Sequence, residues 1–343
     1  MTDVLTDPPL LEVVDLVVQY PVRRGLVGAL ARVPRKVVRA VDGVSFSVRR
    51  GEMLALVGES GCGKTTTAQT IIRLIDPVSG SVKLDGRDLT HLSQRELRPL
   101  RRTMQIVYQD PYESLDPRYR VSRSVEEPML IHDVARDRED RRRRMLDALT
   151  RAELTPPELY LDRYPHELSG GQRQRVAIAA SLVLDPELLV ADEPVSMLDV
   201  SVRAGVLTLL DGLKRAGDMA LLMITHDLST AAHFADRIAV MYLGRIVEEG
   251  PAREVVRNPR HPYTKALLSV VPKRDPRDRS RPEILQGEAP NPIDVPSGCR
   301  FHPRCPVVQE RCRTIDPPLW DVTGSADHRA ACVLVPEEQT AER

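Results

Sequence analysis

The chain has 343 residues, 42% of them hydrophobic and 29% charged, which is ordinary for a soluble globular protein of one large or two modest domains. Lysine and arginine together number 49, and aspartate and glutamate also number 49, so the formal net charge is zero. Neither this balance nor the 3% of aromatic residues favours a nucleic-acid-binding protein.

The N-terminal part of the sequence predicts three strands and a helix. β-Branched and apolar residues with partial alternation predict strands over 11–20 and 37–52, and the second is expected to end in a turn. Residues 21–36 contain proline and glycine and are expected to form a loop or insertion. The apolar run of 53–59 is typical of a buried parallel strand, and helical spacing follows over 65–75.

Strands and helices continue to alternate further along the chain. Residues 78–89 predict a hairpin, and apolar runs over 188–194 and 220–227 predict two more buried strands. The arginine-rich residues 135–152 predict a charged helix, and alternating charges indicate a solvated face rather than a phosphate site. This alternation predicts an α/β fold with a parallel sheet. Residues 272–283, rich in proline and arginine, are interpreted as a linker to a small C-terminal extension.

No stretch of the sequence reaches the roughly 18 consecutive apolar residues of a transmembrane helix. The longest candidate, residues 176–190, is interrupted by Asp185, Pro186 and Glu187. Residues 1–18 lack the basic start and the small-residue cleavage site of a secretory signal. We therefore expect a cytosolic protein, in which disulfides are improbable.

The stretch GESGCGKTT, residues 58–66, fits the pattern G-x-x-x-x-G-K followed by Ser or Thr, between an apolar strand and a helix. Its glycines allow a tight turn that points N–H groups at an anion, and the helix adds its positive end. Lys64 would reach the β- and γ-phosphates, and the Thr65 hydroxyl would bind Mg²⁺. Cys62 is interpreted as a small filler. The expected nucleotide-binding residues are Gly58, Glu59, Ser60, Gly61, Cys62, Gly63, Lys64, Thr65 and Thr66.

A second half of the site is predicted at LLVADEP, residues 188–194, where an apolar strand ends in two acids. Asp192 would hold Mg²⁺, directly or through water. Glu193 would polarise the attacking water as a general base. The alternative, a pair of solvated acids, is disfavoured because the preceding apolar residues bury the strand.

The stretch LSGGQRQR, residues 168–175, resembles the signature motif of ABC-type ATPases. The motifs in the family's order are GESGCGKT (58–65), Gln109 in IVYQDP, LSGGQ (168–172), LLVADEP (188–194), SMLD (196–199) and His226 in ITHD. The resemblance implies an α/β P-loop NTPase fold, the ABC nucleotide-binding domain, with a RecA-like parallel-sheet core, an antiparallel β subdomain and a helical signature subdomain. It also implies ATP hydrolysis coupled to transmembrane transport, the activity of a translocase.

The resemblance further implies roles for single residues. Gln109 would contact Mg²⁺ and the attacking water and sense the transport partner. Asp199 would lie at a dimer seam, and His226 would bind the γ-phosphate and align the water with Glu193. Tyr20 is a candidate for stacking on adenine, although an ordinary strand-end tyrosine is the alternative. The residues expected to cap the γ-phosphate bound to the opposite subunit are Ser169, Gly170, Gly171 and Gln172.

Four longer segments are similar to ATPase subunits of dipeptide/oligopeptide ABC importers, most of all to the second such subunit. They are residues 104–118, 163–175, 258–272 and 298–305. The resemblance implies an ATPase domain over 10–255, with its helical subdomain at about 110–180, and an importer-type extension over 256–343. The transported solute is expected to be a short peptide, with nickel or another small solute as the alternative.

The implied partners are a homologous second ATPase subunit in a heterodimer, two transmembrane permease subunits and an extracytoplasmic solute-binding protein. The chain is then expected to lie peripherally on the cytoplasmic face of the cell membrane. A soluble ABC ATPase of DNA repair or translation is disfavoured, because the sequence has neither coiled-coil heptads nor a second phosphate loop. Glu193 and His226 argue against a regulatory subunit without activity.

Four of the five cysteines are spaced C-x5-C-x6-C-x19-C, as Cys299, Cys305, Cys312 and Cys332. In a small cytosolic extension such a group suits a metal centre, because thiolates are ligands and a staple adds folding energy. The C-x2–4-C pairs common in structural zinc sites do not occur, whereas irregular spacing is compatible with an iron–sulfur cluster. Similar importers carry a 4Fe–4S cluster at this position. Zinc and free thiols remain alternatives.

Overall fold

A computed structural model of the protein describes residues 8–22, 36–217, 219–270, 285, 287–322 and 325–335. They fall into two compact units built from separate stretches of the chain. The first unit is drawn from Met1–Glu12, Ser47–Met53 and Lys83–Ile224, and the second from Val13–Phe46, Leu54–Val82 and Thr225–Arg343. The linker predicted over 272–283, and the predicted loop apart from residues 21, 22 and 36, lie outside the described residues.

Three parallel strands form the core of the first unit, in the order β6 (Met104–Val107), β7 (Leu188–Asp192) and β8 (Ala220–Thr225). Every residue of β7 and β8 is buried, which confirms the two strands predicted from apolar runs. Because the strands are parallel, their carboxyl ends share one edge. The acidic end of β7 therefore lies at the same edge as the segment that follows β6.

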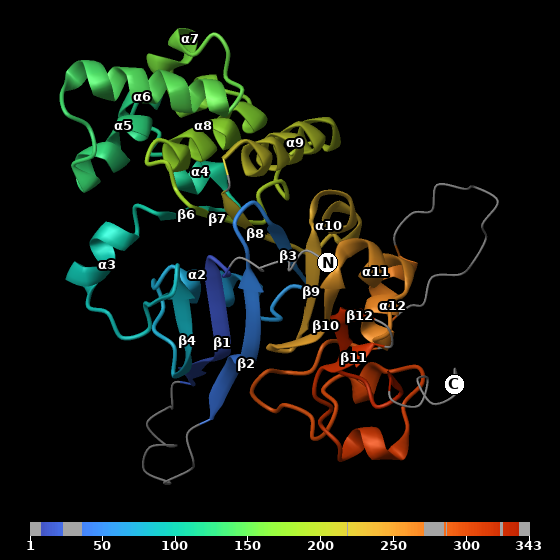
Figure 1. Ribbon diagram of the computed structural model, residues 1–343. Helices are drawn as coiled ribbons and strands as arrows, with labels where there is room; N and C mark the ends of the chain where they lie inside the picture. The colour runs from blue at the N-terminus through green and yellow to red at the C-terminus, as the bar shows by residue number, and fades with distance from the viewer. Residues whose placement is uncertain are drawn as a thin grey trace, which may run out of the picture. The chain divides into compact units, whose positions relative to one another are not determined.

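The helices of the first unit include a bundle of α5, α6 and α8, which pack on one another through apolar side chains (Figure 1). Each turns a stripe of buried residues inward, such as Val125 and Met129 on α5 and Met145 and Leu149 on α6. The elements of this unit outside its core strands are β5 (Arg87–Asp88), α3 (Gln94–Leu100), α4 (Pro111–Ser114), α5 (Val121–His132), α6 (Arg138–Arg151), α7 (Glu158–Leu161), the 3₁₀ turn Pro165–Glu167, α8 (Gly170–Leu182) and α9 (Val200–Gly217).

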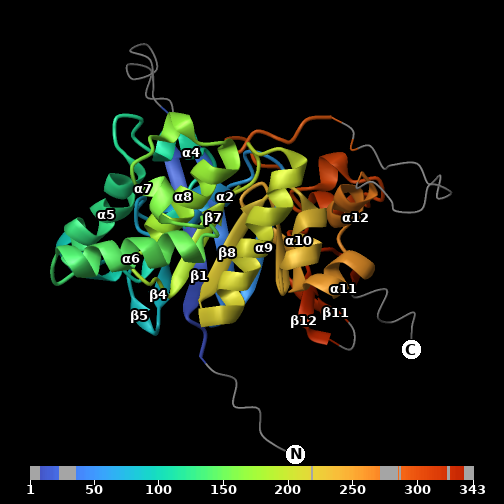
Figure 2. The same ribbon diagram turned by 90° about the horizontal axis from the view of Figure 1, so that it is seen from above.

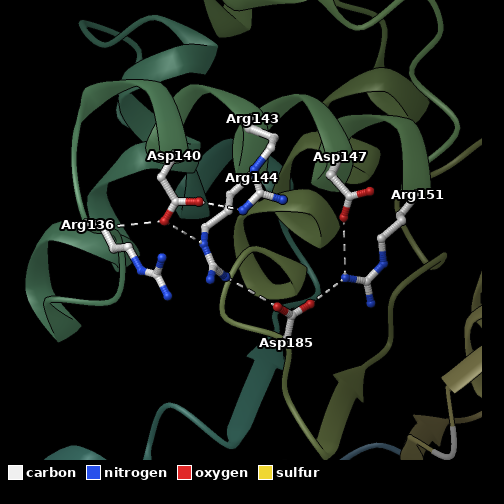
Figure 3. A network of polar contacts seen from close by, with 7 residues as sticks. All are labelled: Arg136, Asp140, Arg143, Arg144, Asp147, Arg151 and Asp185. Carbon is white, nitrogen blue, oxygen red and sulfur yellow. Dashed lines mark hydrogen bonds and ion pairs between the residues drawn. The ribbon is translucent and has the colours of Figure 1, made fainter.

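The arginine-rich helix α6 is held by ion pairs on a solvated face, as its alternating charges predicted (Figure 3). Asp137 caps its first turn by accepting a hydrogen bond from the backbone N–H of Asp140 at 2.8 Å. Arg144 and Arg151 both reach the carboxylate of Asp185, in the turn that follows α8. The arginine run therefore joins α6 to the beginning of β7.

The second unit contains the sheet neighbours β2 (Val37–Val48), β1 (Leu11–Pro21) and β4 (Ser79–Leu84). The predicted hairpin is confirmed, because the end of β4, which belongs to the first unit from Lys83 onward, pairs antiparallel with β5 at Lys83 and Asp88. A further run of strands has the order β11 (Trp320–Val322), β12 (Ser325–Ala330), β10 (Arg245–Pro251), β9 (Arg237–Tyr242) and β3 (Met53–Val57). Strand β3 is parallel to β9, whereas β9, β10, β12 and β11 pair antiparallel in turn. The C-terminal strands thus extend this sheet.

The second unit is completed by α2 (Lys64–Ile71), α10 (Leu228–Phe234), α11 (Ala252–Arg257), α12 (Pro262–Ser269) and the 3₁₀ turns η2 (His302–Arg304) and η3 (Glu310–Arg313). Helix α11 packs on β9 and β10 (Figure 1) and on α10 (Figure 2). Three buried rings, Tyr242, Tyr263 and Phe301, meet with centroids 4.7–5.4 Å apart. This cluster joins β9 to α12 and to the segment after residue 298. No helix among the described residues has the length and apolarity needed to cross a membrane.

Candidate functional site

The glycine-rich loop in the second unit connects β3, all of whose residues are buried, to helix α2. Gly63 caps α2 with a φ of 110°, a conformation that side chains disfavour. A Cβ atom on Gly63 would overlap the carbonyl oxygen of Ala40, and one on Gly58 would overlap that of Met241. These glycines are required by close backbone neighbours as well as by the turn. The loop therefore packs closely against β2, which carries Ala40, and β9, which carries Met241.

Lys64 lies inside this loop with its ammonium group facing backbone carbonyls. Its Nζ donates to the carbonyl oxygen of Gly58 at 2.7 Å and to that of Glu59 at 2.9 Å, and its side chain is buried. Burial raises the pKa of the neighbouring Cys62 thiol, although the Lys64 charge opposes this shift. A cation held by two neutral carbonyl oxygens can exchange them for anionic phosphate oxygens, which bind an ammonium group more strongly.

The acids of the first unit lie where β7 ends. Asp192 is buried, and Glu193 follows it with a φ of 45°, which is unusual for a residue with a side chain. Its backbone is fixed because its N–H donates to the carbonyl of Ile224 at 3.0 Å. The Nε2 of Gln109, two residues beyond β6, donates to the Glu193 carboxylate at 3.2 Å. Strained backbone of this kind is common at active sites, and here it aims a carboxylate at a glutamine amide.

The signature stretch forms the N-terminus of α8, in the first unit. The Ser169 hydroxyl accepts from the Gln172 N–H at 3.3 Å, and the Gln172 side chain accepts from the Ser169 N–H at 3.0 Å. This reciprocal cap defines the helix start. A Cβ on Gly171 would overlap the side chain of Val202 on α9, so this glycine is needed for helix packing. The predicted phosphate-capping role of these residues stays a prediction.

The remaining predicted residues lie at element ends. Tyr20 is near the end of β1 with 38% of its surface exposed, as a ring that stacks on a base requires. Asp199 is exposed just before α9, and His226 is exposed just after β8. Thr65 is the second residue of α2 and is also exposed. All of these positions are compatible with the predicted roles, which the structure does not test.

The described residues of 298–335, called here the cysteine lobe, bring the four predicted cysteines together. Cys299, Cys305, Cys312 and Cys332 line one cavity of about 10 Å³, roughly the room of one water molecule. Burial raises the pKa of Cys299 to about 11 and also raises that of Cys305. Among the described residues no group of three or more His, Cys, Asp or Glu is arranged to hold a metal ion.

The donor chemistry of this cavity nevertheless suits a thiolate centre. Its other lining residues, within the described part of the chain, are two histidines, a proline and apolar side chains, with no carboxylate. Soft thiolates are the ligands that iron–sulfur clusters and zinc select. The cluster and the zinc alternative remain predictions from the sequence.

Two residues that contact the phosphate loop were not assigned a role from the sequence. Tyr263 accepts a hydrogen bond from the Glu59 N–H at 2.9 Å, and Arg304 donates to the Glu59 carboxylate. Both lie in segments that resemble the peptide-importer family, which was the only signal available. Their contacts span more than 200 residues of sequence, beyond the reach of any local pattern.

One feature of the site is a glycine-rich loop that follows a buried strand and contains a buried lysine. The other is a pair of acids at the end of a strand, next to a glutamine. These features define a P-loop nucleotide-binding protein. A family model described as ABC transporter matches residues 41–196, and one described as the C-terminal region of oligopeptide/dipeptide transporters matches residues 247–312.

Individual proteins agree with these family models. The dipeptide transport ATP-binding protein DppF of Escherichia coli is 43% identical over 98% of this chain and 97% of its own length. The oligopeptide transport ATP-binding protein AppF of Bacillus subtilis is 44% identical over 95% and 97%. A solved dimer of the ATP-binding cassette MJ0796, bound to ADP and Pi, is 30% identical with a TM-score of 0.61, over 71% of this chain and 99% of its own. The chain belongs to the family of ABC transporter ATP-binding subunits, in its dipeptide/oligopeptide transport branch.

Proposed function

We propose that this chain is the ATP-hydrolysing subunit of a membrane importer for dipeptides and oligopeptides. The observation that carries the proposal is the hydrogen bond from Gln109 to Glu193, directly after the buried Asp192. A carboxylate fixed by its backbone and oriented by an amide is equipped to polarise a water molecule. Near full-length similarity to peptide transport proteins supports the class of substrate.

In this mechanism each half of the site has its own task. The N–H groups of the phosphate loop and the ammonium of Lys64 bind the β- and γ-phosphates. Thr65 and Asp192 are the residues that would hold Mg²⁺, which neutralises phosphate charge when bound. Glu193 accepts a proton from the attacking water, and His226 and Gln109 keep that water aligned.

The proposed assembly contains a homologous second ATPase subunit, two permease subunits and an extracytoplasmic solute-binding protein. Ser169, Gly170, Gly171 and Gln172 would complete the nucleotide site of the second ATPase subunit, with Asp199 at the seam. The chain would then act at the cytoplasmic face of the membrane. We assign the ATPase domain to residues 10–255 and the importer-type extension to 256–343.

We also propose that Cys299, Cys305, Cys312 and Cys332 hold a 4Fe–4S cluster in the assembled protein. Their convergence on one cavity without a carboxylate, within the described residues, supports a thiolate site. Anaerobically purified protein should be brown and should contain about four irons per chain. Colourless protein with one zinc per chain would favour the zinc alternative, and metal-free protein would refute both.

The function is tested by purifying the complex from membranes and reconstituting it in vesicles. With the solute-binding protein present, short peptides should stimulate ATP hydrolysis, and labelled peptide should accumulate in the vesicles. Stimulation by Ni²⁺ alone would instead assign the transporter to nickel. An ATPase that purifies without permeases and responds to neither solute would contradict the proposal.

A further inference from the structure

We propose that Arg304 and Tyr263, which lie outside the ATP motifs, are positioning residues for the phosphate loop, so that the cysteine lobe sets the affinity for ATP. This inference rests on the proposed function, because it concerns the nucleotide site of the same ATPase. All of its residues belong to the second unit. It stands on two direct contacts to Glu59, the second residue of the loop.

The first contact is a two-pronged ion pair. Arg304 Nη1 lies 2.8 Å from Oε2 of Glu59, and Nη2 lies 3.1 Å from Oε1. The Arg304 side chain is only 8% exposed and that of Glu59 30% exposed, so water screens the pair weakly. The guanidinium also lies 6.0 Å from the ring centroid of Tyr242, within reach of a cation–π interaction. This geometry fixes the Glu59 side chain in one direction.

The second contact fixes the backbone of the same residue. The hydroxyl of Tyr263, on helix α12, accepts from the Glu59 N–H at 2.9 Å, and the tyrosine is fully buried. The Glu59 carbonyl meanwhile accepts from Lys64 Nζ at 2.9 Å. Side chain, N–H and carbonyl of Glu59 are therefore all engaged, and movement of Arg304 or Tyr263 would be passed to Lys64.

The supports of these two residues are themselves buried. The ring nitrogen Nδ1 of His261 caps α12 by accepting from the backbone N–H of Tyr263 at 3.1 Å. The backbone N–H of His261 donates to the Glu248 carboxylate at 2.9 Å. The same carboxylate lies 2.8 Å from Nε2 of His328 on β12 of the cysteine lobe. Glu248, on strand β10, thus connects helix α12 to the cysteine lobe. The helix and the lobe together fix the position of Tyr263.

Arg304 is coupled to the cysteines through its own segment. It ends the 3₁₀ turn η2 and directly precedes Cys305, while Nδ1 of His302 lies 2.9 Å from the carbonyl oxygen of Cys299. A rearrangement of the cysteines would therefore displace the turn that presents the guanidinium. ATP affinity is expected to follow the state of the lobe, whereas the general base Glu193 and its partner Gln109 belong to the first unit.

The test measures KM for ATP, kcat and the Kd of a fluorescent ATP analogue in the full transporter. Arg304→Gln should raise KM and Kd by about tenfold, the loss of one charge-assisted contact, with kcat changed less than about twofold. Tyr263→Phe should raise them by about threefold. The matched control is Arg313→Gln, which removes an exposed arginine of the same lobe that pairs with Glu310 and should change neither value.

A double-mutant cycle separates positioning from a general loss of structure. In a Glu59→Gln background, adding Arg304→Gln should raise KM by less than about twofold, because the ion pair is already broken and only one neutral acceptor oxygen is left for Arg304. If Arg304→Gln does not fold, Arg304→Lys keeps the charge without the two-pronged geometry and should give an intermediate KM.

Two results would overturn the inference. One is a KM for Arg304→Gln, or for Arg304→Lys, equal to that of Arg313→Gln. The other is an undiminished effect in the Glu59→Gln background. If the KM shifts occur but peptides neither stimulate hydrolysis nor accumulate, the proposed function fails while the positioning role stands.

Discussion

Single residues in this protein carry constraints that the one-dimensional motif does not reveal. Gly58 and Gly63 were predicted from the loop pattern, and the structure adds that backbone carbonyls leave no room for a Cβ at either one. Glu193 was predicted as an acid at a strand end, yet its positive φ depends on backbone pairing with Ile224. Such pairing is a tertiary fact, so the sequence could supply the residue but not its orientation.

At this scale His261 gives a prediction about pH. Complete burial lowers its pKa to about 4, from 6.5, so the unfolded chain binds a proton that the folded protein refuses. The neutral His261 therefore stabilises the folded protein fully above pH 6.5. As the pH falls from 6.5 toward 4, the free energy of unfolding decreases by about 3 kcal/mol.

His261→Asn keeps an acceptor for the helix cap but does not titrate, so its melting temperature should fall less between pH 7 and pH 4.5 than that of the parent. The comparison is made by thermal unfolding across that pH range. His166→Asn, at an exposed position, is the control and should follow the parent curve. Parallel curves for His261→Asn and the parent would refute the assignment.

At the scale of elements, local patterns were informative wherever an element buries a face regularly. The strands β1, β3, β7 and β8, the hairpin and the helices α2 and α6 all follow from apolar periodicity and charge. The cysteine lobe was different, because its 3₁₀ turns and the short strand β11 have no periodicity. Its attachment depends on Glu248, a buried acid within a strand, which no binary pattern marks as an anchor.

The junction between α6 and β7 gives the prediction for elements. Asp185 forms ion pairs with Arg144 and Arg151 (Figure 3). Its backbone has a φ of 52°, a left-handed conformation that asparagine tolerates well. Its side chain is 60% exposed, so each pair contributes only about 0.5 kcal/mol.

Asp185→Asn should therefore lower the free energy of unfolding by about 1 kcal/mol, and about 1 M salt should remove most of that difference. Asp185→Ala should cost about 1 kcal/mol more, because alanine disfavours the left-handed backbone. Urea unfolding of both variants at two salt concentrations measures these effects. Equal stabilities of the two variants would show that the left-handed backbone does not matter, and a difference from the parent that does not change with salt would show that the ion pairs do not matter.

At the scale of the whole molecule, chain order of the motifs predicted the family, and the comparisons confirm it. What the sequence could not supply is how the C-terminal extension is used. The ion pair between Arg304 and Glu59 joins residues 245 positions apart in the sequence, and it connects the cysteine lobe directly to the phosphate loop. The extension is accordingly interpreted as part of the nucleotide-binding unit rather than as an appendage.

The central claim, that Glu193 drives hydrolysis of bound ATP to power uptake, is tested most directly by Glu193→Gln in reconstituted vesicles. The glutamine preserves size and leaves the phosphate loop intact, so ATP binding should persist. Hydrolysis and peptide uptake should both fall at least about a hundredfold, as expected for loss of a general base. Uptake at the parental rate would contradict the mechanism.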